Sequence, residues 1–136
     1  MRFGWDARKA SNRLMQLAIS AAVGLAVIYS YIYFREPFSP FTNTLLADIL
    51  TVSASVFSAV SASLIWRMYE KTDAPRRVWS YFALGLWIWV IAELTWSYGN
   101  LTLPNGEVPV GLPDVFWILA YYFLGQALLS QYKILV

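Results

Sequence analysis

The stretch that decides the fold runs from Val78 to Tyr98 and reads VWSYFALGLWIWVIAELTWSY. Its 21 residues include one charged side chain, Glu93. A helix needs about 20 mainly apolar residues to cross the roughly 30 Å of hydrocarbon in a bilayer. A small soluble core cannot hide a helix that is apolar on every side, whereas lipid accepts it without penalty. This stretch therefore predicts a transmembrane helix.

Three further stretches have the same character, over residues 14–34, 45–66 and 115–136. Short polar segments that contain proline separate the four, so consecutive helices are expected to be antiparallel neighbours. We predict one all-α domain over residues 1–136, an integral membrane bundle of four transmembrane helices with short loops. The third helix is expected over about 78–98.

Composition supports a membrane protein and excludes several kinds of chemistry. Hydrophobic residues make up 59% of the chain and charged residues 13%, against roughly 45–50% and about 25% in soluble domains. The chain has no cysteine and no histidine, so thiolate sites and histidine-ligated haem or chlorophyll are excluded. No catalytic triad, phosphate-binding loop or metal-ligand spacing is present. We predict a protein that is not an enzyme and has no metal, no resident cofactor and no nucleic-acid partner; an apolar ligand, lipid or pigment remains open.

The basic residues predict the orientation. Nine of the ten fall on one side of the four-helix arrangement, and only Arg35 falls on the other. The positive-inside rule makes the nine-residue side cytoplasmic. Both termini are therefore expected inside the cell, and the protein in the cell (inner) membrane as a multi-pass protein. The nine residues are Arg2, Arg8, Lys9, Arg13, Arg67, Lys71, Arg76, Arg77 and Lys133.

Glu93 is the most informative single residue. It is expected one to two turns below the outer end of its helix, where an acid costs up to about 2.5–3.5 kcal/mol. Trp89 and Trp96 share its helix face by spacing. Two interpretations are open: a structural clamp that is hydrogen-bonded to another helix, or a site for a ligand or partner.

Local signals predict two helix starts on the same side as Glu93. Asn43 or Thr44 can cap the helix over 45–66, with Asp48 in or near its first turn. Asp114 is expected in the first turn of the last helix, where an acid favours the positive end of the helix dipole.

These acids lead to a second open question. Asp48, Glu93 and Asp114 are all expected toward the outer side, with Arg35 as the only base there. They form either a small cavity that binds a cation or polar ligand, or two helix-start acids beside one paired glutamate.

Small side chains recur at four-residue spacing in the stretch 45–66. This spacing lets helix backbones approach closely in lipid, so we predict a central, tightly packed helix; a hydrophilic pore is the alternative. The positions expected to pack are Ala54, Ser58 and Ala62 in one row, and Ser55, Ala59 and Ser63 in the other.

Tryptophans and tyrosines are abundant, and many fit the aromatic belts of membrane interfaces. Trp87, Trp89 and Trp117 are expected deeper in the membrane. They could line a pocket for a flat ligand.

The segment 87–125 resembles the multi-helix input domain at the N-terminus of many bacterial diguanylate cyclases and sensor kinases. In that family, a helix with an acid and a tryptophan precedes a Pro-Ser-x-Ala-Asp-x-Phe-Tyr/Trp-Leu-x-x-Tyr stretch. Val110, Gly111 and Pro113 depart from that pattern. The matching positions are Glu93, Trp96, Asp114, Phe116, Trp117, Leu119 and Tyr121.

The resemblance implies a sensory or regulatory input module of a bacterial inner membrane. The alternative is a small accessory subunit of a larger energy-transducing complex, photosynthetic or respiratory. A transporter or channel is disfavoured because no broken helix pair is evident. Expected partners are the bilayer and either other membrane subunits or further copies of the chain. The candidate ligand- or partner-binding residues are Glu93, Trp89, Trp96, Asp114, Trp117, Tyr121, Arg35 and Asp48.

Overall fold

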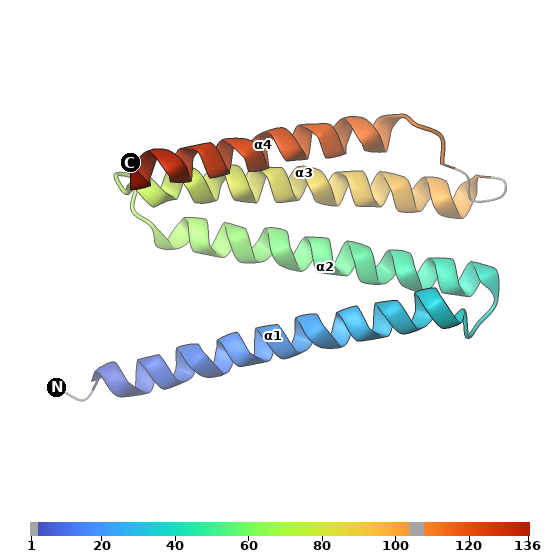
Figure 1. Cartoon of the computed structure of the whole chain (residues 1–136), viewed down its shortest axis with the longest axis horizontal. Coiled ribbons are helices and arrows are strands. Elements are labelled where there is room, and N and C mark those ends of the chain that lie inside the picture. Colours follow the sequence, from blue (N-terminus) through green and yellow to red (C-terminus); the bar gives the residue numbers. More distant parts are fainter. Residues whose placement is uncertain (1–2, 104–107) are drawn as a thin grey trace. The chain divides into compact units, whose positions relative to one another are not determined.

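A computed structural model describes the backbone of residues 3–103 and 108–136, and the side chains of residues 16–103 and 108–136. This part of the chain is all-helical, which confirms the predicted fold class (Figure 1). Its helices are α1 (Phe3–Arg35), α2 (Pro40–Met68), α3 (Ala74–Thr102) and α4 (Leu112–Leu135).

All four helices are long and apolar enough to cross a membrane; in α1 the qualifying segment is Gln16–Arg35. α1, α2 and α3 extend beyond their predicted apolar stretches at both ends, because flanking residues continue the helical backbone. α4 begins three residues before its predicted stretch and ends at Leu135. Insertion and orientation remain predictions. Arg2 and the side chains of Arg8, Lys9 and Arg13, on which the orientation partly rests, lie outside the described residues.

The chain divides into two compact units, Met1–Asn43 and Thr44–Val136. The first holds α1 and the first turn of α2. At the end of α1, the backbone N–H of Glu36 donates to the Ile32 carbonyl at 3.0 Å. Glu36 has a φ of 43°, in the left-handed region that ends many helices. Pro37 follows and cannot continue the helical hydrogen bonds.

The start of α2 differs from the prediction. The helix begins at Pro40, and the cap is Ser39, whose Oγ accepts from the Thr42 backbone N–H at 3.3 Å. Asn43 lies inside the helix, where its side chain bonds both the N–H and the carbonyl of Phe38, at 3.1 and 3.0 Å. Asp48 is consequently two turns into α2 and not in its first turn, so the helix dipole does not explain it.

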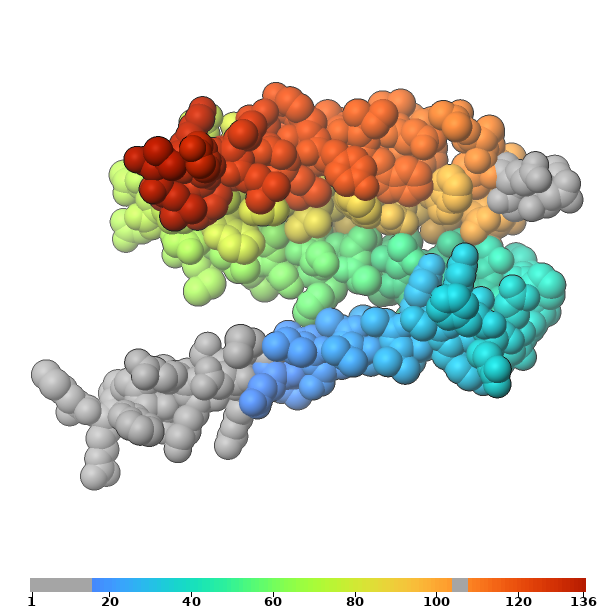
Figure 2. Space-filling view, viewed as in Figure 1, coloured from blue at the N-terminus to red at the C-terminus, as the bar shows by residue number. Residues whose placement is uncertain are grey.

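Within the second unit, α2, α3 and α4 run alternately up and down (Figure 1). In Figure 2 the side chains of α4, orange to red, lie against those of α3 over much of the hairpin. The two helices approach closely at Gly85. A Cβ there would meet the Leu124 side chain at 3.1 Å and the Ala120 carbonyl oxygen at 3.2 Å. A small residue at position 85 thus sets the spacing of the α3–α4 hairpin.

Side chains also connect α2 to α3. The indole N–H of Trp87, near the middle of α3, donates to Oγ of Ser63, in the last third of α2, at 3.0 Å. At the turn between them, the Arg76 guanidinium lies 5.3 Å from the centre of the Trp66 ring and donates to the Tyr69 carbonyl. These contacts position α3, the helix that carries Glu93.

Candidate functional site

Glu93 lies between α3 and α4 and is only 8% exposed. Its Oε1 accepts two indole hydrogen bonds. Trp89, one turn earlier on α3, donates from Nε1 at 2.8 Å, and Trp117 of α4 donates at 3.3 Å. One carboxylate oxygen therefore links the two helices of the hairpin.

Aromatic rings surround this carboxylate. Trp89 meets Tyr121 edge to face, with ring centres 5.1 Å apart, and Trp96 meets Trp117 at 5.4 Å. Each pair joins α3 to α4. The tryptophans are half-buried and Tyr121 is 60% exposed. We call Glu93 and these four rings the Glu93 centre; it brings together five of the eight candidate binding residues.

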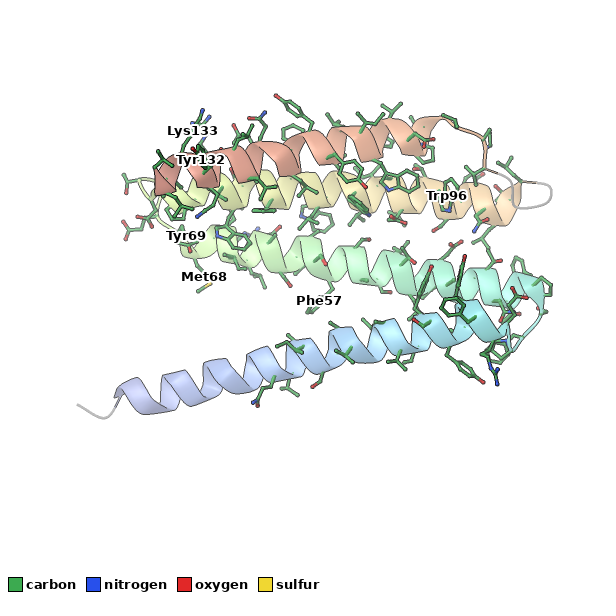
Figure 3. All side chains as sticks on the ribbon, in the orientation of Figure 1. Phe57, Met68, Tyr69, Trp96, Tyr132 and Lys133 are labelled. Carbon is green, nitrogen blue, oxygen red and sulfur yellow. The ribbon has the colours of Figure 1, made fainter. Side chains whose placement is uncertain are left out.

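The centre lies deeper along α3 than expected. Glu93 is nine residues before the helix end at Thr102, which corresponds to roughly 13 Å at a rise of 1.5 Å per residue. The predicted depth of one to two turns assumed that the helix ends at Tyr98. The helix continues for another turn, to Thr102. Figure 3 shows Trp96 in the half of α3 nearer the α3–α4 connection, and Tyr132 and Lys133 at the opposite end of the hairpin.

Asp48 has a separate partner. The side-chain Nδ2 of Asn100 lies 3.4 Å from Asp48 Oδ1 and 3.3 Å from Oδ2, which joins α2 to α3. Sequence reasoning missed Asn100. Its only signal was a polar side chain near the end of an apolar helix, which resembles an ordinary helix terminus.

Asp114 occupies the first turn of α4, as predicted. Its Oδ2 accepts from the Gly111 backbone N–H at 2.8 Å. This bond explains the acid at that position as part of the helix start. Arg35 is the last residue of α1, in the other compact unit.

The packing residues of α2 fall into two groups. Ala59 and Ala62 are buried, with 0% and 3% exposure. Ser63 and Ser55 are half-buried, and Ser63 bonds to Trp87 of α3. Ala54 and Ser58 are exposed. The row Ser55–Ala59–Ser63 therefore contacts α3 through Ser63. In the other row, Ala54–Ser58–Ala62, only Ala62 is buried.

A separate apolar groove of about 420 Å³ lies beside the half of the hairpin nearer the α3–α4 connection. Residues 91–98 of α3 form one wall, and Val108 to Pro113 form the other. Within the described residues, no group of three or more histidine, cysteine, aspartate or glutamate side chains could hold a metal ion.

Comparisons with family models, with curated proteins and with solved structures find no match to this chain. The Glu93 centre therefore has to be interpreted from its own geometry and chemistry.

Proposed function

We propose that this protein is a non-catalytic sensory or regulatory module of a bacterial inner membrane, and that the Glu93 centre is its sensing element. One observation carries the proposal: a single buried carboxylate oxygen accepts hydrogen bonds from indoles on two different helices. The resemblance of the segment 87–125 to bacterial input domains favours the same function.

The geometry gives a physical route from the centre to the rest of the hairpin. A change at the carboxylate, in its charge or in what it binds, alters the bonds to Trp89 and Trp117 together. Because these residues lie on different helices, the relative position of α3 and α4 changes with them. Shifts of about 1–2 Å between packed helices are a common switching movement.

The orientation follows from charge. Arg67, Lys71, Arg76 and Arg77 lie at or beside the α2–α3 turn, and Figure 3 shows Lys133 at the same end of the second unit as Tyr69. We place this end in the cytoplasm. A signal read at the Glu93 centre, in the outer half of the bundle, would then reach the cytoplasmic ends of α3 and α4.

A distance measurement between the two helices tests this function. The chain contains no cysteine, so Leu84→Cys and Leu129→Cys place spin labels on exposed positions of α3 and α4. In lipid nanodiscs, Glu93→Gln is expected to shift the distance distribution by about 1–2 Å. Glu70→Gln makes the same chemical change at an exposed position and should leave the distribution unchanged. Identical distributions for both variants would leave Glu93 as a static clamp and contradict the proposal.

Extraction from the native membrane in mild detergent tests the alternative function. A sensory module should be isolated without a fixed set of other subunits. A stoichiometric large assembly would instead favour an accessory subunit of an energy-transducing complex.

A further inference from the structure

The two carboxylate oxygens of Glu93 differ in their surroundings. Among the described residues, Oε2 accepts no hydrogen bond, and no lysine or arginine nitrogen lies within 4.0 Å of the carboxylate. Every fully enclosed side-chain nitrogen or oxygen in the same part of the chain has a partner. Oε2 is therefore not fully enclosed, although the Glu93 residue as a whole is buried.

The charge of this carboxylate is not balanced by its indole donors. An indole N–H is neutral, so two of them orient the carboxylate without cancelling its charge. Acids inside transmembrane helices are rare, and they usually pair with another group because an unpaired charge there is costly. The structure thus offers an open oxygen to a positively charged ligand.

The rings identify the class of cation. Tyr121 is exposed, and Trp96 and Trp117 are half-buried. The π faces of such rings attract positive charge and also contact apolar groups. Metal ions such as Ca²⁺ need six or more oxygen ligands, and this centre has one carboxylate. An organic cation with apolar substituents satisfies both the carboxylate and the rings.

We propose that the Glu93 centre binds a lipophilic organic cation, such as a substituted ammonium or phosphonium. Its positive charge lies at Oε2, and its apolar groups pack on the exposed parts of Trp96, Trp117 and Tyr121. This inference rests on the proposed function to the extent that it names the signal which the sensing element recognises.

Equilibrium dialysis of radiolabelled tetraphenylphosphonium against the full chain in nanodiscs tests the site. Wild type and Glu70→Gln are expected to show saturable binding of equal affinity. Glu93→Gln should weaken binding at least tenfold, because the charge partner is lost. Neutral triphenylphosphine oxide should not compete. Equal binding by Glu93→Gln, or effective competition by the neutral compound, would overturn the proposal.

A second variant keeps the test decisive if Glu93→Gln does not fold. Trp96→Leu removes a ring without touching the carboxylate and should weaken binding about fivefold, the effect of losing one cation–π contact. Unchanged affinity in Trp96→Leu would show that the probe binds elsewhere.

The spin-labelled protein separates this inference from the proposed function. Cation binding that depends on Glu93 but leaves the α3–α4 distance unchanged would retain the ligand site and reject the sensory role. If Glu93→Gln shifts the α3–α4 distance but the wild type does not bind the cation, the sensory role is retained and the ligand site is rejected.

Discussion

At the scale of single residues, Glu93 shows how a membrane protein accommodates an acid within an apolar helix. Glu93 is only 8% exposed, and water is absent from the hydrocarbon around transmembrane helices, so bulk water cannot supply the partners of its carboxylate. Trp89 and Trp117 supply them because indole combines a large apolar body with one N–H donor. Both donors act on the same oxygen, which leaves the other one open.

The bond between Trp117 and Glu93 is measurable by a double-mutant cycle. Trp117→Phe removes the N–H and keeps a ring, and Glu93→Leu removes the acceptor. We expect a coupling free energy of about 0.6–1.7 kcal/mol, the range measured for hydrogen bonds between transmembrane helices. The measurement is the free energy of unfolding in mixed micelles. A parallel cycle of Trp117→Phe with Asp48→Asn should give a coupling near zero, since Asp48 bonds to Asn100. Additive effects in the first cycle would mean that the bond contributes nothing.

At the scale of helices, two features fix how α3 is held. Gly85 allows α4 to approach closely, and the bond from Trp87 to Ser63 fixes α3 against α2. In lipid, neither the close approach at Gly85 nor the bond from Trp87 to Ser63 depends on burying apolar surface, because lipid is as apolar as the helix faces. Packing and hydrogen bonds between helices replace the hydrophobic effect there.

Two glycine substitutions test the close approach. Gly125 of α4 has nothing within 4 Å of an added Cβ, so Gly125→Ala should be neutral or stabilising by up to about 1 kcal/mol, the helix-propensity gain. Gly85→Ala should be the less stable of the two, because its Cβ meets the backbone oxygen of Ala120. Unfolding free energies of the two variants decide. Equal gains would show that α3 and α4 have room between them.

Two serine substitutions test the contact between α2 and α3. Ser63→Ala removes the acceptor of the Trp87 N–H and should cost about 0.6 kcal/mol. Ser58→Ala should be close to neutral, because its hydroxyl is exposed and donates only to the Ala54 carbonyl of its own helix. Denaturation of both variants in the same detergent gives the comparison. A larger loss in Ser58→Ala would contradict the assignment of the two faces.

At the scale of the whole molecule, charge rather than packing predicts the orientation. The predicted cytoplasmic side carries nine of the ten basic residues, and moving so many charges across a membrane is unfavourable. Two of the described basic side chains at the α2–α3 turn also lie near aromatic rings: Arg76 lies over Trp66 and Arg77 lies 5.7 Å from the Tyr81 ring centre.

Reporter fusions test this orientation. A fluorescent protein fused after Val136 should fluoresce, and alkaline phosphatase at the same position should be inactive, because the C-terminus is expected in the cytoplasm. Phosphatase inserted at Pro109, between α3 and α4, should be active. An active phosphatase after Val136 would reverse the orientation and place the Glu93 centre in the inner half of the membrane.

The sequence by itself determined the number and type of helices, because the length and apolarity of a membrane span are local properties. It also marked Glu93, since an acid is conspicuous in an apolar helix, and Asp114, since helix-start signals are local. It could not assign the face that each helix packs, because helices that are apolar on every side carry no stripe to indicate it. The rotation and register of α2, α3 and α4 were decided only in the tertiary structure. These paired Asp48 with Asn100, placed Gly85 against Ala120, and brought indoles from two helices to one oxygen of Glu93.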